Sequence, residues 1–499
     1  MAEKEAPAAA VQLPARRSVF EAAPEEDLLY SMSADGKRKY MHPVVRKGRY
    51  WKIRRALAYS LFALFFALPL IPVGGFPAVF LDLASRRFHI FGATFNPTDN
   101  LLLAAFGLGI IVTVFFVGST FGRMWCGYAC PQTVYLEFLF RPIEALFEGG
   151  PVKQKRLNAA PWDLRKAGTK AAKWAAWAVV ALAMSLTFVA YFVGFSHLLW
   201  NLVLDPLSMR GTLFTVAAVT ALILFDFGWF RDQMCTIACP YGRLQNVMAD
   251  KDTILVAYDD KRGDPKAKEK DRLPDRVYGD CIDCKSCVAS CPTGTDIRRG
   301  LQPECIGSAQ CIDACDDVMR RIGLPIGLVK YTSEREQAGE VRRIIRPRTI
   351  VYLVILAIAW GTLAALLLTR GDAQIEIVRN GREPYRILPD GGVANQQRLR
   401  ITNQLREEQK FTVEVLSPRG TSLVVSESPV VVEADKVVTV DIVTTVAQGV
   451  FHDGQVPVRY LIRSDRGFRK EADFLLLGPY GEEGEEKRDE RHEQKGGKH

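Results

Sequence analysis

The chain has 499 residues, of which 48% are hydrophobic and 24% are charged, and its 65 Lys and Arg against 56 Asp and Glu give a net charge of +9. This composition excludes a mostly disordered chain, and apolar runs of membrane-spanning length exclude a simple soluble enzyme. The basic residues cluster beside the apolar runs, so the positive charge indicates membrane orientation, and we expect no nucleic-acid partner.

In chain order, residues 1–45 come first and lack apolar periodicity, which predicts a mobile cytoplasmic tail. Five apolar runs follow, each close to the roughly 20 residues that cross a bilayer. No apolar core of a signal peptide precedes them, so the first run should stay in the protein as a helix. Buried helices of a large soluble protein are the alternative, but five such runs favour a five-helix transmembrane bundle. The runs are Ala56–Phe76, Leu101–Thr120, Ala175–Phe195, Leu213–Phe230 and Thr349–Leu368.

Lys and Arg are unevenly distributed between the segments that flank these runs. Nine lie in residues 36–55 and nine in residues 121–173, against two in residues 77–100 and one in residues 196–212. Because cytoplasmic flanks carry the excess of Lys and Arg, we expect a cytoplasmic N-terminus and alternating loops. Five spans then place the chain after Leu368 in the periplasm, which makes this a multi-pass protein of a bacterial inner membrane.

Three polar residues lie near the predicted spans. Asp226, at the end of the fourth run, is either functional or reaches to water at the membrane edge. His89 and His197 fall in the loops predicted to be external, where we expect them to be solvated.

The second and fourth runs each lead into a cysteine pair that is followed by proline. Cys126 and Cys130 align with Cys235 and Cys239 at an offset of 109 residues, with Ala and Pro also in register, which indicates an internal repeat. The i, i+4 spacing predicts that both sulfurs of a pair lie on one helical face. Four converging thiolates suit a soft metal, either Cu(I), zinc or another iron–sulfur cluster, or they form redox-active pairs. Four buried structural cysteines are the alternative.

The segment between the fourth and fifth runs contains an iron–sulfur motif. Cys281, Cys284, Cys287, Cys291 and the following proline match the C-x2-C-x2-C-x3-C-P spacing. This spacing wraps three thiolates around one cluster and sends the fourth to a second cluster. A structural zinc site would show two separated pairs instead. The motif therefore predicts a dicluster ferredoxin-like insert.

A second half of this motif follows, with serine at one position. Cys305, Ser308, Cys311 and Cys315 repeat the spacing of the first half. Crossed ligation assigns one [4Fe–4S] cluster to Cys281, Cys284, Cys287 and Cys315. The second cluster would be held by Cys291, Cys305 and Cys311, with only Ser308 at the fourth position. We expect it as [4Fe–4S] or [3Fe–4S], and a scaffold that has lost the cluster is the alternative.

The positions of the cysteines agree with the predicted orientation. All 11 lie between residues 126 and 315, in segments that the charge pattern places in the cytoplasm. Cytosolic thiols stay reduced, so we expect metal ligands rather than disulfides.

After the fifth run, short alternating segments separated by Gly, Pro, Asn and Asp predict an immunoglobulin-like β-sandwich of about seven strands. It has no cysteine, so docking or scaffolding is its expected role. The whole chain then divides into the segments 1–45 (tail), 46–248 (helices one to four with both cysteine pairs), 249–345 (4Fe–4S insert), 346–370 (helix five), 371–480 (β-sandwich) and 481–499 (disordered charged tail).

This order of features resembles the cytochrome c oxidase accessory protein family CcoG, also called FixG or RdxA-like, a family of membrane-bound polyferredoxins. The resemblance covers residues 40–480, and the family pattern has cysteine at the position of Ser308, which puts the second cluster in doubt. The segments that carry the resemblance are Trp125–Gln132, Met234–Arg243, Cys281–Cys284, Cys291–Gly294 and Cys311–Asp316.

The resemblance implies a role in the assembly of cbb3-type cytochrome c oxidase. Family members look like cupric reductases, an oxidoreductase activity that would make copper the substrate and the four paired cysteines the catalytic thiols. Implied partners are a cytoplasmic electron donor, copper-delivery proteins, the oxidase assembly machinery and the lipid bilayer. Two alternatives are a quinol dehydrogenase-type carrier to a periplasmic reductase and a non-catalytic, copper-holding assembly factor.

Overall fold

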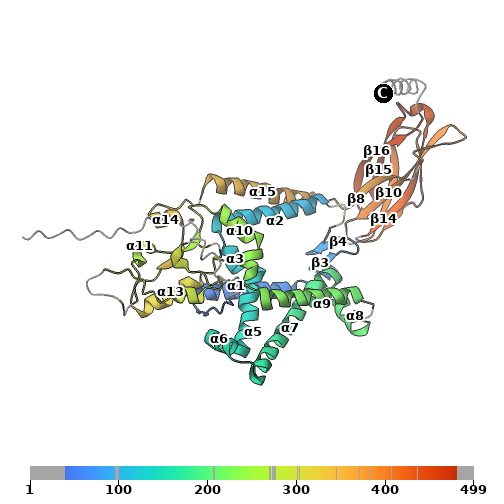
Figure 1. Cartoon of the computed structure of the whole chain (residues 1–499). Helices are drawn as coiled ribbons and strands as arrows, with labels where there is room; N and C mark the ends of the chain where they lie inside the picture. Colours follow the sequence, from blue (N-terminus) through green and yellow to red (C-terminus); the bar gives the residue numbers. More distant parts are fainter. Residues whose placement is uncertain are drawn as a thin grey trace, which may run out of the picture. The chain divides into compact units, whose positions relative to one another are not determined.

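The computed structural model describes residues 40–479 apart from 96–99, 206–207, 269–270, 272–276, 301, 303, 344, 370, 381–382, 406 and 435. The expected charged tail 481–499 and most of the expected tail 1–45 lie outside the described residues. The chain forms two compact units, Met1–Leu363 and Ala364–His499. Figure 1 labels the helices and strands of both units.

Four helices in the described part of the chain are long and apolar enough to cross a membrane. Most of their surface is exposed and apolar, as expected of helices that face lipid. The last of these four helices packs against the first of them, and the two run side by side (Figure 1). Trp360 Nε1 of the last donates a hydrogen bond to Thr113 Oγ1 of the first at 3.1 Å. The four are α2 (Asn100–Phe121), α7 (Leu164–Val193), α9 (Arg210–Leu224) continued by the π-helical turn η3 (Phe225–Phe230), and α15 (Pro347–Leu368).

The first predicted run forms a shorter helix than expected. Helix α1 (Arg49–Ala67) starts among basic residues and ends nine residues before Phe76. Pro69, Pro72 and two glycines follow, and these residues do not continue a helix. The chain instead forms the strands β1 (Pro72–Val73) and β2 (Phe76–Pro77). The expected helix Ala56–Phe76 is therefore corrected at its C-terminal end, and a count of five spans stays a prediction.

The segment after α1 is a small antiparallel sheet rather than an open loop. Its strands are β3 (Val79–Asp82), β4 (Arg87–Ile90) and β5 (Ala93–Phe95). His89 on β4 is only 4% exposed and stacks on Phe76 with ring centroids 3.8 Å apart. The expectation that His89 is solvated is wrong, because the sheet buries it. His197 lies exposed on α8 (Phe195–Leu204).

Short helices and turns connect the long helices and end the repeat units. Two of them, η2 and η4, are π-helical, a geometry often found at functional sites. The short elements are α3 (Met124–Tyr128), α4 (Pro131–Tyr135), η2 (Leu136–Phe140), α5 (Arg141–Glu148), α6 (Pro151–Ala159), η4 (Met234–Ala238) and α10 (Pro240–Met248).

The insert before α15 is closed by a two-stranded antiparallel sheet. Strand β6 (Leu255–Tyr258) pairs with β7 (Val329–Thr332), which brings the two ends of the insert together. Its core contains the buried Cys281, Cys287 and Cys315. The enclosed helices are α11 (Asp260–Gly263), α12 (Ser286–Ser290), η6 (Ile297–Arg299) and α13 (Gln310–Arg321), and α14 (Glu334–Ala338) follows β7.

The second unit is a sandwich of two antiparallel sheets, as the alternating pattern predicts. One sheet has the order β12-β14-β10-β8 with β9 beside β10, and the other has the order β13-β11-β15-β16. Inward-facing apolar side chains of both sheets form its core. The strands are β8 (Ala373–Arg379), β9 (Arg386–Ile387), β10 (Gly392–Asn403), β11 (Gln409–Ser417), β12 (Ser422–Val425), β13 (Val430–Val432), β14 (Val437–Ala447), β15 (Gln455–Ser464) and β16 (Arg469–Leu477), with the 3₁₀ turn η7 (Gln448–Val450) after β14.

Candidate functional site: two cysteine cavities and a cluster of paired thiols

The four cysteines assigned to the first cluster line one cavity. Cys281 and Cys284 come from the loop that enters α12, Cys287 lies in the first turn of α12, and Cys315 comes from the middle of α13. Lys285 has φ +56°, which turns the loop tightly around the cavity. The remaining walls include Tyr258, Met319 and Leu328. Four thiols in an apolar pocket form the donor set that a [4Fe–4S] cluster takes.

The second set of residues lines a second cavity. Cys291, Cys305, Cys311 and Ser308 all lie in its wall, and Ser308 is 6% exposed. The two halves also share backbone geometry. Ala309 has φ +58° and starts α13, as Lys285 starts α12 one repeat earlier. The structure therefore groups the residues as crossed ligation predicts, and ligation itself stays a prediction.

Burial disfavours the bare thiolates in both cavities. It raises the pKa of Cys287 and of Cys315 to about 12, and that of Cys305 to about 11. Within the described residues, no three His, Cys, Asp or Glu side chains lie close enough together to hold one metal ion. Thiols spread around a cavity suit a polynuclear centre, whose positive irons offset the cost of burying thiolates. The cavities are therefore compatible with iron–sulfur clusters.

The paired cysteines do not lie on single helices. Cys126 is in α3 and Cys235 is in η4, and both elements end before the second cysteine. Cys130 (φ −63°, ψ 126°) and Cys239 (φ −73°, ψ 111°) are extended. The proline that follows each of them excludes helical backbone before it and begins the next helix. The expectation that both sulfurs share one helical face is therefore wrong, but the two junctions are alike, as an internal repeat predicts.

The four paired thiols form a common electrostatic environment. Burial raises the pKa of Cys126 to about 12, and the nearby Cys130 and Cys239 raise it further. Burial also raises the pKa of Cys235, with Cys130, Cys126 and Cys239 adding to the effect. Backbone amides at the start of α4 partly offset the burial of Cys130. The four thiols thus influence one another's charge, but among the described residues no three of them lie close enough to hold one metal ion, so their convergence on a metal stays a prediction.

The loop of the first pair packs directly against the second cavity. A methyl group on Gly127 would lie 2.8 Å from the carbonyl oxygen of Ile306 and 2.9 Å from Cα of Ser308. The Tyr331 hydroxyl donates to Gly307 O at 2.8 Å and accepts from the Tyr128 hydroxyl, 3.2 Å away. No atom layer separates the paired thiols' loop from the wall that carries Ser308.

Arg141 of α5 connects the second pair with the second cavity. Its Nη2 donates to the carbonyl oxygen of Pro292 at 3.2 Å. Burial lowers its pKa, and the charges that oppose this include Cys291 and Cys235. The Arg141 charge therefore acts on a cysteine of each site and compensates negative charge on either.

Sequence reasoning missed several polar residues of this region. The Gln245 side chain of α10 accepts a hydrogen bond from the Cys126 thiol at 3.5 Å and donates one to Gly122 O at 3.1 Å. Gln132 donates to Asp226 Oδ1 at 3.0 Å, so Asp226 connects η3 to the first pair. Gln132 follows the Cys-Pro signature directly, which is the one available signal. The partners are 94 to 123 residues apart, and no local pattern links them.

Three family models match the chain. Residues 230–334 match a 4Fe-4S dicluster domain, residues 102–149 match a 4Fe-4S binding domain, and residues 363–479 match an IG-like fold at the C-terminus of FixG. The dicluster match includes both cysteine cavities and the second cysteine pair. The match over residues 102–149 includes the first pair.

Curated relatives cover most of the chain. Protein RdxA of Cereibacter sphaeroides is 37% identical over 69% of this chain and 74% of its own length. Nitrogen fixation protein FixG of Rhizobium meliloti is 31% identical over 89% of this chain and 94% of its own length. Among solved structures, a FixG-related protein from Vibrio parahaemolyticus covers 22% of this chain at 14% identity, with a TM-score of 0.20.

Proposed function

The chain belongs to the family of FixG and RdxA, and we propose on this premise that it reduces Cu(II) to Cu(I) at its paired thiols. It is a membrane protein with 4Fe–4S domains that carries electrons. In the proposal, copper is the substrate, and Cu(I) leaves for the assembly of a cbb3-type cytochrome c oxidase. Copper-delivery proteins and the oxidase assembly machinery would receive it.

One observation carries the proposal, namely the contact between the first pair's loop and the second cavity. Gly127 lies against Ile306 and Ser308. When bound, iron–sulfur clusters supply one-electron carriers in the two cavities, held by the residues described above. Cys126, Cys130, Cys235 and Cys239, which are all partly buried, then offer soft ligands to copper. Soft thiolates favour Cu(I) over Cu(II), which makes reduction at this place easier.

The protein's own residues position the copper ligands. The extended junctions at Cys130 and Cys239 each join two short helices, so small rotations there bring sulfurs onto one ion. Gln245 accepts from the Cys126 thiol, and Arg141 compensates negative charge near Cys235. The thiols exchange their protons for the metal when copper binds.

The decisive experiment uses full-length protein purified without oxygen and reduced with dithionite. Adding Cu(II) should bleach the reduced-cluster spectrum while a chelator reports Cu(I). Cys126→Ser with Cys130→Ser, and Cys235→Ser with Cys239→Ser, should each stop this reaction without loss of cluster iron. Ala129→Ser is the matched control, because it places a hydroxyl between the first two cysteines and removes no sulfur. Clusters that stay reduced with Cu(II) would exclude the cupric reductase.

A third cluster at the paired thiols is the second candidate. The observation that favours it is the 4Fe-4S binding model over residues 102–149, which contains Cys126 and Cys130. Iron analysis separates the two readings, since two full [4Fe–4S] clusters give about eight irons per chain and three give about twelve. Loss of about four irons in the Cys126→Ser, Cys130→Ser variant would support this candidate over copper.

We also propose that the paired thiols face the cytoplasm and the β-sandwich faces the periplasm of the inner membrane. The excess of Lys and Arg before α1 and between α2 and α7 supports this orientation. A phosphatase reporter fused after residue 479 should be active, and one fused in residues 153–163 should be inactive. The reverse pattern would contradict the orientation.

A further inference from the structure

A further cavity lies between α1, η2, α5 and α6, away from the cysteine ligands. Its volume is about 310 Å³, which is within the range of small-molecule sites. Trp51, Tyr59 and Phe138 give it aromatic walls, and His42, Arg141 and Glu144 give it polar groups. Aromatic walls with a few polar groups suit a flat ring that carries oxygens at its edge.

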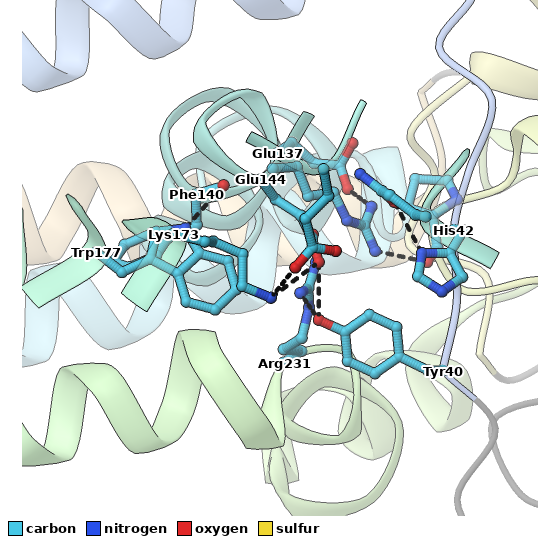
Figure 2. Close-up of polar contacts among 12 residues, drawn as sticks. Tyr40, His42, Glu137, Phe140, Glu144, Lys173, Trp177 and Arg231 are labelled. Atoms are coloured by element: carbon cyan, nitrogen blue, oxygen red, sulfur yellow. Dashed lines mark hydrogen bonds and ion pairs between the residues drawn. The ribbon is translucent and has the colours of Figure 1, made fainter. Parts of the chain in front are cut away.

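Glu144 is a buried acid in the wall of this cavity, and Figure 2 shows its polar contacts. Its side chain accepts from Arg231 Nη2 at 2.9 Å and from the Tyr40 hydroxyl at 3.2 Å, and Lys173 Nζ lies 3.8 Å away. Burial raises the pKa of Glu144 to about 7, although Lys173 opposes the shift. Glu144 therefore both gains and loses a proton near neutral pH.

Other charged and titratable groups surround Glu144 on every packed element. Glu148 and Arg141 lie on its own helix, Lys170 and Lys173 on α7, and Arg231 after η3. Glu148 pairs with Lys173 at 2.7 Å and with Lys170 at 2.8 Å, and it is not part of the cavity wall. Tyr40 faces Glu144 from the N-terminal segment, whereas His42 of the same segment bonds to Gln154 at 2.8 Å, and Glu137 of η2 pairs with Arg141. Burial lowers the pKa of His42. His42 is thus a neutral hydrogen-bonding partner at neutral pH.

Arg141 joins this cavity to the redox region. It lies in the cavity wall and donates to Pro292 O, next to Cys291. Its Nε has no hydrogen-bond partner among the described residues, although the side chain is 9% exposed. Arg141 therefore reaches from the cavity wall to the backbone beside Cys291, and its Nε remains available as a donor.

The cavity also lies where α1 changes from charged to apolar. Arg55 and Tyr59 are both in the wall, and Arg55 is the last charged residue of α1 before its end at Ala67. Aromatic and basic side chains mark the edge of a bilayer. An amphipathic molecule dissolved in the membrane would meet this cavity at the level of its polar head.

We propose that this cavity binds the ring of a membrane quinol and is the entry point of electrons. Quinol loses two electrons and two protons and becomes quinone. The iron–sulfur clusters accept the electrons one at a time, the Glu144 carboxylate accepts one proton, and water in the cavity accepts the other. The proposal rests on the electron-transfer function and is independent of copper as the acceptor.

Binding is tested with an azido derivative of a short-chain ubiquinone on the full-length protein in detergent. After illumination, label should appear in peptides that contain Trp51 or Phe138. Ala145→Phe fills the cavity from an exposed position of its wall, and it should reduce labelling about tenfold or more. Equal labelling of this variant and the parent, or label confined to other peptides, would overturn the proposal.

The proton step is tested by mixing oxidised protein with decylubiquinol and following cluster reduction. The rate should rise with pH through about 7 as Glu144 loses its proton. Glu144→Gln should bind the quinone label normally, lower the rate about 100-fold and remove this pH dependence. Glu148→Gln is the matched control, one turn along α5, and should keep a pH dependence, moved to lower pH because the Glu148 charge raises the pKa of Glu144. Equal losses in both variants would overturn the role of Glu144.

The copper proposal and the quinol proposal are tested separately by adding each reagent to the protein on its own. Reoxidation of dithionite-reduced protein by Cu(II) should be unchanged in Ala145→Phe, because that reaction bypasses the cavity. If Cu(II) fails to reoxidise the parent but quinol reduces it, the copper proposal fails and the quinol site stands. If quinol fails while Cu(II) works, the quinol site is wrong.

Discussion

At the residue scale, Ser308 is the position where this chain departs from its own repeat. Its side chain lies in the wall of the second cavity beside Cys291, Cys305 and Cys311. A hydroxyl is a harder ligand than a thiolate and suits iron–sulfur clusters less well. We therefore expect the second cluster to be more labile than the first.

Ser308→Cys completes the set of four thiols and should slow the loss of iron to a chelator about tenfold or more, the size of effect that ligand-shell changes produce. Chelator kinetics with paramagnetic resonance of the reduced clusters measures this. Ser286→Cys is the control, since Ser286 lies in the first cavity, which already has four thiols. Identical iron loss in the parent and Ser308→Cys would contradict the prediction.

Gly127 is the residue at which the loop of the first cysteine pair touches the second cysteine cavity. Gly127→Ala must push the first pair's loop away from Ile306, because the methyl group has no room. We expect reoxidation of the clusters by Cu(II) to slow about 10- to 100-fold, since small misplacements of reacting groups have effects of this size. Stopped-flow absorbance measures the rate, and iron analysis checks that the clusters remain. Gly107→Ala on α2, with open space around it, should react like the parent.

At the element scale, α1 has no capping side chain of its own. Gly48 precedes the helix, and Asp313 of α13 accepts from the backbone N–H of Tyr50 at 3.1 Å and of Trp51 at 2.8 Å. A carboxylate at a helix N-terminus satisfies free donors and interacts favourably with the helix dipole. The iron–sulfur insert is thus attached to α1 through the residue between Cys311 and Cys315.

Asp313→Ala should lower the stability of the first unit by about 1 to 2 kcal/mol, the usual effect of losing a helix cap. Thermal unfolding of the full-length protein, followed by circular dichroism, measures it. Asp317→Ala on the same helix removes a partly exposed ion pair with Arg46 and should change stability by less than about 1 kcal/mol. Similar melting of Asp313→Ala and the parent would show that the cap contributes nothing.

The backbone at the two cysteine pairs is set by two competing local preferences. The i, i+4 spacing predicts a shared helical face, but the prolines after Cys130 and Cys239 end the helical turn before the second cysteine. Both effects are local and compete, and the proline effect prevails because the residue before proline avoids helical backbone. The pairs therefore present their sulfurs at helix junctions, where two chain segments meet.

At the scale of the whole molecule, the two units have separate cores. The core of the sandwich is formed by residues of β8–β16 alone, and Leu399 and Ile442 in it are fully buried. A separate core predicts separate folding. Residues 371–479 expressed alone should therefore unfold in one cooperative transition, as measured by urea titration.

Within this isolated unit, Leu399→Ala should lower the free energy of unfolding by about 2 to 5 kcal/mol. Val424→Ala is the control, because Val424 on β12 is 64% exposed, and it should change the value by about 0.5 kcal/mol or less. A broad, non-cooperative transition of the parent fragment would contradict independent folding.

The sequence alone determined the apolar helices α2, α7, α9 and α15 and the sandwich, and it predicted the two sets of cysteines that each line one cavity. Each depends on a local regularity, either apolar runs, alternation with period two or fixed cysteine spacing, and such regularities act within one segment of chain. The first helix was predicted too long because its apolar run continues past Pro69. The run stays apolar there, but proline lacks the backbone N–H that a helix needs, and α1 ends at Ala67.

Only the tertiary structure decided which distant segments meet. It placed Gly127 against the Ser308 loop, Arg141 at the carbonyl oxygen of Pro292 beside Cys291, and the buried Glu144 with its ionic partners in the wall of a cavity. His89 was likewise expected in water but is buried under Phe76. These contacts join residues far apart in the chain and depend on burial, which is a property of the packed molecule. No local pattern of residues encodes which side chains become buried.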